Sequence, residues 1–257
     1  WMGKKVIINP SLDWGNDLRV QQKNYRILGL PDHGTHAELV KVPAGNLTRK
    51  PSYLSFEEAA ALPLAGLTGY RALFVKGRVM PGETVFITGI GGGVAALMLQ
   101  MAVAAGARVF VSSGSPSKLE KAKQAGAAGG INYTEKNWAR NLAKISGGAG
   151  IDLIVDGAGG KEFNQLISLV KPAGRIVVYG ATAGNPEQID LRKIFWKQIS
   201  ICGTTMGNQQ DFDRMVKFYR KHKIKPIISH IYPLAGYKKA YQEMMEGKQL
   251  GKIVLVP

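Results

Sequence analysis

One glycine-rich segment limits the possible folds of this chain more than any other part of it. An apolar run over residues 84–88 enters the loop Gly89-Ile-Gly-Gly-Gly93, and a stretch with an apolar helical stripe follows. Glycines let the backbone turn tightly and approach a ligand, and the free N–H groups at the start of the next helix attract phosphate. Gly89, Gly92 and Ala95 are the small residues of this pattern, which is one residue shorter than usual. The segment predicts a pyrophosphate site for a dinucleotide.

Strand-like and helix-like segments alternate downstream of this loop. The strand-like runs are mostly continuous and apolar, as expected for parallel strands that are buried on both faces. The pattern predicts an α/β fold with strands at Thr84–Thr88, Arg108–Ser112, Gly130–Tyr133, Asp152–Asp156, Arg175–Tyr179 and Gln198–Cys202, and with helices at about 94–105, 116–126, 137–146, 160–171 and 209–222.

Local signals mark three ends of two of these helices. Ser115 followed by Pro116 is typical of an N-cap and a first helical residue. Gly106 and Gly126 follow apolar-periodic stretches, where glycine commonly ends a helix.

The two ends of the chain do not show this alternation of strands and helices. Short strand-like pieces at Lys5–Asn9 and Thr35–Val42 are separated by polar loops with Pro and Gly, as in a β-rich domain. Strand-like pieces return at Ile227–Ile231 and Lys252–Val256, around one short helix. We therefore expect a dinucleotide-binding domain over residues 56–222, flanked by the ends at 1–55 and 223–257.

Composition narrows the class of protein. No apolar run reaches the roughly 18 residues that a membrane span needs. Cys202 is the single cysteine, which excludes an internal disulfide and a cysteine-cluster zinc site and favours a cytoplasmic location. The net charge of +16 favours anionic ligands such as phosphorylated cofactors. Because the lysines are spread along the chain without an RNA-module signature, we interpret them mainly as a solvated surface and do not expect nucleic acid as a partner.

The end of the second strand predicts which dinucleotide is bound. In such folds an acidic residue there accepts hydrogen bonds from the 2′-OH of NAD, whereas a cationic residue accommodates the 2′-phosphate of NADP. This strand has no acidic residue at its end; instead it offers the hydroxyl groups of Ser112, Ser113 and Ser115 and the ammonium group of Lys118. We therefore predict NADPH as the cofactor.

Several segments, in order along nearly the whole chain, resemble the medium-chain dehydrogenase/reductase superfamily, in its quinone-oxidoreductase and zinc-type alcohol dehydrogenase-like branches. The resemblance implies a doubly wound Rossmann domain with part of a GroES-like β-barrel domain, NAD(P)H in the cleft, and a homodimer through the sheet edge near Gln198–Met206. It also implies that the chain begins part-way through the barrel. The segments that carry the resemblance are Gly34–Val40, Phe56–Pro63, Gly66–Tyr70, Pro81–Glu83, the glycine loop, Ser117–Ala122, Ile131–Tyr133 and Gly174–Gly180.

The same resemblance assigns candidate cofactor contacts by position. They comprise Gly92, Gly93 and Val94 at the pyrophosphate, Ser113, Lys118 and Tyr133 around the adenosine phosphate, Gly157, Ala158 and Gly180 beside the ribose and nicotinamide, Thr68 near the nicotinamide, and Lys252 over the pyrophosphate.

Zinc is not expected. The position that zinc alcohol dehydrogenases give to a cysteine ligand is Leu64 here, and the segment Ser11–Leu28, where their structural-zinc cysteines would fall, has none. His33 and His36 lie in a loop without a nearby thiolate, so we interpret them as surface residues. Without zinc, hydride transfer suits an activated acceptor, such as a quinone or an α,β-unsaturated carbonyl compound.

Three alternatives remain open at this point. The first is a zinc-type alcohol dehydrogenase. The second is a short-chain-type reductase, because Tyr219-x-x-x-Lys223 matches the catalytic pair of that class, although Met206 stands where its serine partner is expected. The third is a non-catalytic NADPH- or RNA-binding protein, which the positive charge would favour.

Overall fold

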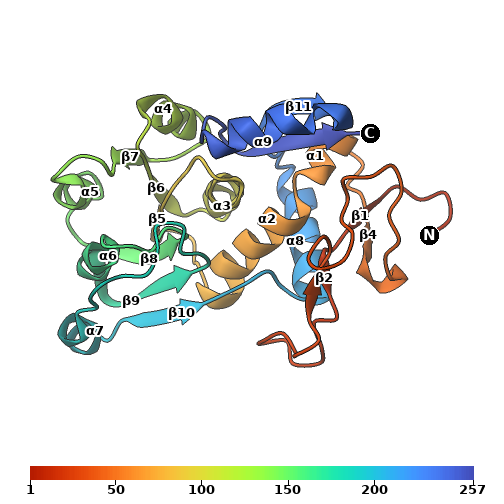
Figure 1. Cartoon of the computed structure of the whole chain (residues 1–257). Helices are drawn as coiled ribbons and strands as arrows, with labels where there is room; N and C mark the ends of the chain where they lie inside the picture. The colour runs from red at the N-terminus through yellow and green to blue at the C-terminus, as the bar shows by residue number, and fades with distance from the viewer. The chain divides into compact units, whose positions relative to one another are not determined.

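The computed structural model describes all residues from Trp1 to Pro257, and the chain divides into two compact units (Figure 1). Residues 69–205 form one unit, here called the central unit. Residues 1–68 and 206–257, the two ends of the chain, together form the other, here called the terminal unit. None of the helices has the length and apolar composition that crossing a membrane would require.

The central unit is built on a six-stranded parallel sheet with the order β10-β9-β8-β5-β6-β7. The chain extends the sheet from β5 towards β7 and then returns to the other side of β5, so the strand order reverses between β5 and β8. This is the doubly wound arrangement that the sequence predicts. The strands are β5 (Thr84–Ile87), β6 (Arg108–Ser113), β7 (Gly129–Asn132), β8 (Ile151–Asp156), β9 (Val170–Val178) and β10 (Ser200–Gly203).

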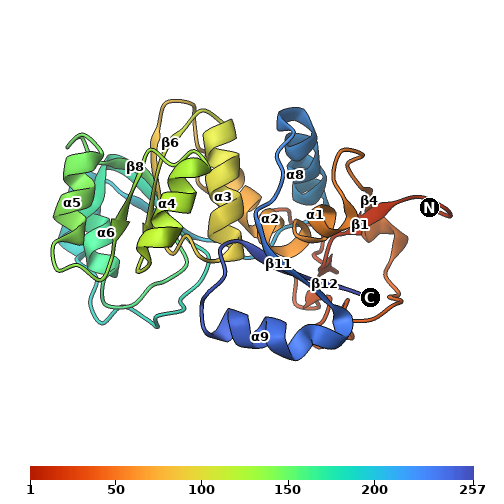
Figure 2. The same cartoon turned by 90° about the horizontal axis from the view of Figure 1, so that it is seen from above.

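Helices cover both faces of this sheet. Figure 2 shows α3 and α4 on one face and α5 and α6 on the other. The predicted helices are present within a few residues of their expected ends, whereas α7 was not predicted. The helices are α3 (Gly93–Ala104), α4 (Pro116–Gln124), α5 (Trp138–Ile145), α6 (Phe163–Leu169) and α7 (Leu191–Lys197). A π-helical segment, η2 (Arg71–Lys76), precedes β5.

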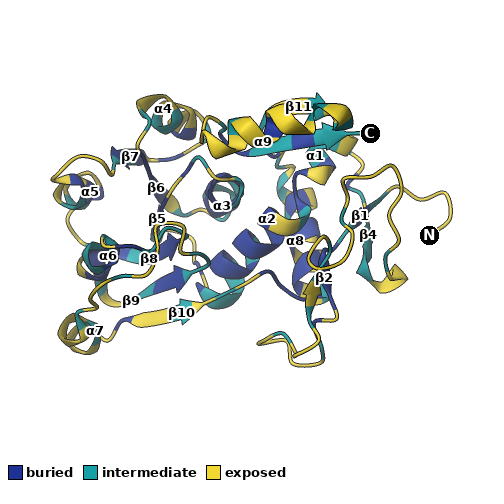
Figure 3. Cartoon of the chain, in the orientation of Figure 1, coloured by how far each residue is buried: buried dark blue, intermediate teal, exposed yellow.

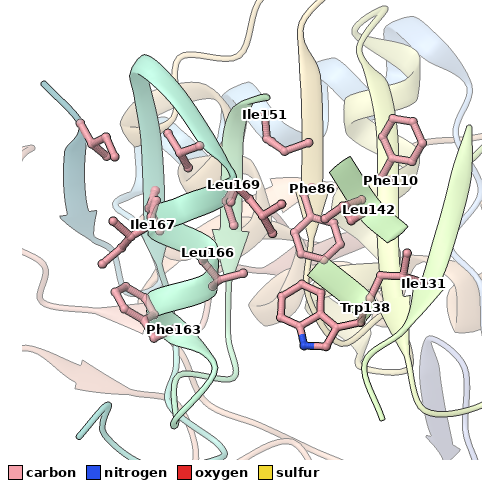
Figure 4. Packing of buried hydrophobic residues seen from close by; sticks show 14 residues of the cluster. Phe86, Phe110, Ile131, Trp138, Leu142, Ile151, Phe163, Leu166, Ile167 and Leu169 are labelled. Atoms are coloured by element: carbon pink, nitrogen blue, oxygen red, sulfur yellow. The ribbon is translucent and has the colours of Figure 1, made fainter. Parts of the chain in front are cut away.

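Large apolar side chains from the sheet, α5 and α6 form one core (Figure 4). Phe86 of β5 stacks on Trp138 of α5, with their ring centroids 6.3 Å apart. Phe163 and Leu166 of α6 complete the same cluster, and all four side chains are buried. Burial of each such side chain contributes about 1.5–3 kcal/mol to stability. This cluster therefore holds α5 and α6 against one face of the sheet.

The predicted helix ends are confirmed. Gly106 and Gly126 both have positive φ, +82° and +101°. After each glycine the chain makes the pair of backbone hydrogen bonds of a Schellman turn, such as Gly106 N–H to Val103 O at 2.9 Å and Ala107 N–H to Ala102 O at 3.0 Å. Ser115 is the N-cap of α4, but its hydroxyl contacts Ser117 instead of a backbone amide.

The terminal unit contains three small sheets and several helices. Strand β1 (Val6–Ile8) pairs antiparallel with β4 (Leu47–Arg49), β2 (Ser11–Leu12) pairs antiparallel with β3 (Arg26–Ile27), and β11 (Ile228–Pro233) pairs parallel with β12 (Lys252–Val256). The helices are α1 (Phe56–Ala60), α2 (Pro63–Tyr70), whose last two residues belong to the central unit, α8 (Gln209–His222) and α9 (Tyr237–Met245), with short 3₁₀ turns η1 (Ala44–Asn46) and η3 (Leu234–Gly236).

Two expectations for this unit differ from the structure. Thr35–Val42 is not a strand: no strand pairs with it, and Leu39 is 90% exposed, so its alternating pattern has no sheet to join. The compact units also divide at 68 and 206, not at 55 and 223. Helix α8 belongs to the terminal unit because Thr48 donates a hydrogen bond to Asp213 at 2.6 Å and the Tyr53 hydroxyl donates to the carbonyl of Tyr219 at 2.8 Å.

Candidate functional site

The candidate site of the central unit lies at the carboxyl edge of the sheet, beside the point where the strand order reverses. Ligands of doubly wound folds bind at this edge, in the crevice outside the strand ends. Three loops meet there, after β5, β8 and β9, and the end of β6 lies beside the first of them.

The glycine loop leaves the start of α3 without a capping side chain. Gly89 has a φ of +66°, a conformation that favours glycine. Gly92 is the N-cap residue of α3 and provides no side-chain hydrogen bond, whereas Asn208 caps α8 and Asp190 caps α7. The first helical amides, those of residues 93–95, therefore have neither an intrahelical nor a side-chain acceptor. They are suited to bind an anion such as a pyrophosphate.

Ser112 at the end of β6 holds the glycine loop in place. Its hydroxyl oxygen accepts the N–H of Gly89 at 3.1 Å, and its carbonyl accepts the N–H of Ile90 at 2.9 Å. The sequence predicts a contact from Ser112 to the cofactor, and the structure adds this role in supporting the loop. Ser113 is likewise buried, and its oxygen accepts the N–H of Ser115 at 3.1 Å.

Tyr133 and Lys118 lie beside the end of β6. Tyr133 directly follows β7, and its half-exposed ring lies over Gly114, where an added Cβ would be 3.2 Å from the tyrosine oxygen. Lys118 is in the first turn of α4, and partial burial, with a smaller effect of Lys121, lowers the pKa of its ammonium group. The ends of β6 and β7 therefore present one aromatic ring and one cation.

A buried carboxylate lies under the loop that follows β8. Asp156 is fully buried, and its oxygens accept hydrogen bonds from Thr88 at 2.6 Å, from the N–H of Ala158 at 3.2 Å and from the N–H of Gly159 at 2.9 Å. The N–H of Gly157 in turn donates to the Thr88 hydroxyl at 3.2 Å. Neither Thr88 nor Asp156 was predicted from the sequence to be part of the site. The sequence does contain a signal for them, because each is a polar residue at the end of a buried apolar strand.

Gly157 and Gly180 pack closely because neither has a side chain. An added Cβ on Gly157 would lie 2.5 Å from the ring of Tyr179, and one on Gly180 would lie 3.0 Å from the carbonyl of Gly157. Burial, and secondarily the charge of Asp156, raise the pKa of Tyr179, so its hydroxyl stays protonated. The Tyr179 ring therefore supports this loop as a neutral group.

Thr68 and Lys252 belong to the terminal unit. Thr68 is buried in α2 and donates a hydrogen bond to the carbonyl of Leu64 at 3.0 Å. Lys252 is the first residue of β12, and burial lowers the pKa of its ammonium group. The structure thus places these two candidates in one unit and the remaining candidates in the other.

The residues present do not fit a catalytic zinc ion. Leu64, at the position where zinc alcohol dehydrogenases have a cysteine ligand, carries no donor atom. No group of three or more His, Cys, Asp or Glu side chains is arranged to hold a metal ion.

The structure also argues against Tyr219 and Lys223 as a catalytic pair. Tyr219 is fully buried, its hydroxyl has no hydrogen-bond partner, and burial raises its pKa. The ammonium group of Lys223 instead lies over the ring of Tyr53, 4.9 Å from its centroid. A tyrosine without solvent access cannot deliver a proton to a substrate. The structure therefore does not support a short-chain-type reductase.

Comparisons with known proteins agree with this architecture. The zinc-binding dehydrogenase family matches residues 93–221. The zinc-type alcohol dehydrogenase-like protein YogA of Leptosphaeria maculans is 34% identical over 99% of this chain and 75% of its own length. Quinone oxidoreductase-like protein 2 of Bos taurus is 28% identical over 95% of this chain and 73% of its own length. A crystal structure described as an NAD-dependent alcohol dehydrogenase superposes with a TM-score of 0.92 at 36% identity, covering 99% of this chain and 76% of that one.

The contact between Gly157 and Tyr179 leads to a stability prediction. Gly157→Ala should lower the free energy of unfolding by about 1–3 kcal/mol, because the added methyl group would overlap the Tyr179 ring. Urea denaturation followed by circular dichroism measures the change. Gly203→Ala is the matched control, since the nearest atom to its added Cβ is 4.0 Å away. Equal stability of the two variants would show that the ring does not restrict this position.

The unpaired hydroxyl of Tyr219 leads to a second prediction. Tyr219→Phe should leave turnover unchanged and should raise the unfolding free energy by up to about 1 kcal/mol, because it removes a buried polar atom that has no partner. Steady-state kinetics and thermal unfolding measure both effects. A variant that lost turnover while still binding the cofactor would show that this hydroxyl takes part in the reaction.

Proposed function

Because the chain belongs to the medium-chain dehydrogenase/reductase superfamily, and because one related structure is described as an NAD-dependent alcohol dehydrogenase, we propose that it is an NADPH-dependent reductase of quinones or α,β-unsaturated carbonyl compounds. The observation that carries this proposal is the uncapped, glycine-led start of α3 beside a second strand that ends in serines and no acidic residue.

The preference for NADPH rests on the groups around the end of β6. An acidic residue would repel the additional phosphate of NADPH, and residues 111–118 contain none. Lys118 supplies a cation, and an ammonium–phosphate hydrogen bond is stronger than one between neutral groups. The hydroxyl groups of Ser112 and Ser113 each retain a proton to donate. One relative in the comparison is described as NAD-dependent.

Reaction without zinc is supported by Leu64 and by the likeness to quinone oxidoreductase-like proteins. When bound, the reduced nicotinamide would supply the hydride. The amides at the start of α3 would hold the pyrophosphate, and the loops at Gly157 and Gly180, which pack closely against each other, would line the ribose and nicotinamide. The acceptor therefore has to be activated by its own conjugation and by hydrogen bonds, as a quinone or an enone is.

A second copy of the chain is the proposed partner at β10. This strand pairs only with β9, so its other edge carries unpaired backbone groups. The neighbouring helix α7 exposes Leu191, Phe195 and Trp196, with 69%, 66% and 83% of their surfaces accessible. Figure 3 shows α7 and much of β10 as exposed. An apolar patch beside an open strand edge suits a homodimer in which two edges meet around a twofold axis.

The single thiol supports a cytoplasmic location. Cys202 has no second cysteine to pair with, so the chain gains nothing from an oxidising compartment. Burial raises the pKa of this thiol, which keeps it in the less reactive protonated form.

The cofactor preference can be tested by titrating NADPH and NADH against tryptophan fluorescence. NADPH should bind more tightly, and Lys118→Ala should weaken NADPH binding by about tenfold or more while leaving NADH binding unchanged, because only NADPH has the additional phosphate. Lys123→Ala, on another side of α4, is the matched control. NADPH oxidation with a panel of quinones and enones then tests the reaction, and equal or tighter binding of NADH would contradict the proposed cofactor.

The proposed dimer can be tested by changing its apolar patch. The double variant Phe195→Glu/Trp196→Glu should shift the protein from dimer to monomer, because four charges would be desolvated across a twofold interface. Sedimentation velocity measures the change. Ile145→Glu is the control, since this exposed residue of the same unit lies on α5. A wild-type protein that is monomeric at micromolar concentration would contradict the proposal.

A further inference from the structure

We propose that Asp156 and Thr88 act as a positioning pair that fixes the loops after β5, β8 and β9 relative to one another. The coupling of the loops stands on the geometry of the central unit alone. Its consequence for nucleotide binding rests on the proposed function, because these loops carry the candidate cofactor contacts Gly89, Gly92, Gly157, Ala158 and Gly180.

Thr88 is the connection between the first two loops. It lies immediately after β5, directly before Gly89, and its hydroxyl has two partners on the neighbouring strand end. It donates a hydrogen bond to Asp156 at 2.6 Å and accepts one from the N–H of Gly157 at 3.2 Å. One hydroxyl therefore holds the start of the glycine loop against the start of the loop that follows β8.

Asp156 orders the loop that follows β8. Its carboxylate accepts the amides of Ala158 and Gly159, which fixes the direction of the chain just beyond the strand. Gly159 and Gly160 both have positive φ, +65° and +67°, so the chain there makes a tight turn around the carboxylate. A fully buried carboxylate whose partners are one hydroxyl and two amides depends on all of them, since a lost donor would leave charge without compensation.

The third loop is attached to the second by backbone hydrogen bonds. The N–H of Thr182 donates to the carbonyl of Gly157 at 3.2 Å, and the N–H of Ala183 donates to the carbonyl of Ala158 at 2.8 Å. The N–H of Gly160 donates to the carbonyl of Gly184 at 2.7 Å. The position of residues 179–184 therefore depends on that of residues 157–160, which the Asp156 carboxylate holds in place.

This arrangement makes a specific prediction for Thr88→Val and Thr88→Ser. Valine has the shape of threonine but lacks the hydroxyl group, so it removes both hydrogen bonds at once. Serine keeps the hydroxyl group and is the matched control. Hydrogen exchange of the nucleotide-free protein, followed on peptides that cover residues 86–96, 153–164 and 177–186, should be about tenfold faster in all three regions for the valine variant and unchanged for the serine variant.

Nucleotide binding provides the second measurement. The dissociation constant for NADPH should rise by about tenfold in Thr88→Val and stay near the wild-type value in Thr88→Ser, because loops that are no longer held together must be ordered on binding. Asp156→Asn provides a second variant. It keeps an acceptor for Thr88 but replaces the oxygen facing Gly159, so it should accelerate exchange mainly in the peptide over residues 153–164.

The outcomes separate this inference from the proposed function. Faster exchange confined to residues 86–96, or a serine variant that behaves like the valine variant, would overturn the positioning role. A lower melting temperature with unchanged exchange in the other two loops and unchanged NADPH affinity would show a structural role only, and would also overturn it. Coupled exchange in a protein that binds neither NADPH nor NADH would support the coupling and refute the proposed function.

Discussion

The site depends on backbone amides at the start of α3 that the protein itself leaves without acceptors. Helices α7 and α8 begin with an aspartate or asparagine that accepts such hydrogen bonds, whereas α3, like α4 and α9, has no capping side chain and begins after Gly92. Helix-start amides without acceptors lower the stability of the protein unless a ligand accepts their hydrogen bonds. The remaining structure around the loop, from Ser112 on one side to Thr88 on the other, holds these amides in position.

Support for the site comes from buried polar groups, and one of them, Ser112, is also a candidate cofactor contact. The exposed residues Gly89 and Gly92 have no side chains, so the loop cannot be held from outside. Hydrogen bonds from the adjacent strand ends replace that missing support. Below the loops, the buried residues Asp156 and Thr88 are larger and polar, whereas the exposed loop positions Gly89 and Gly92 have no side chain.

The sequence predicted the central sheet well, because buried parallel strands are continuous apolar runs and because the glycine loop fixes where the series begins. It predicted α7 poorly, since its residues Leu191–Lys197 combine exposed apolar and basic side chains without a buried stripe. Thr35–Val42 has the alternation of a strand but no partner in the structure. The hydrogen bond from Thr88 to Asp156 joins residues 68 positions apart, and local patterns carry no information about such a pairing.

The central unit interrupts the terminal unit, and this order has a consequence for how the chain folds as it is synthesised. Residues 69–205 are contiguous, so their sheet can form as soon as they have left the ribosome, whereas the hydrogen bond from Thr48 of β4 to Asp213 of α8 can form only after the far end of the chain has been made. Once the inserted unit has folded, residues 69 and 205 are held at a fixed separation. The entropic cost of closing the terminal unit is then that of a short loop instead of a long one, so prior folding of the interior segment favours association of the two ends.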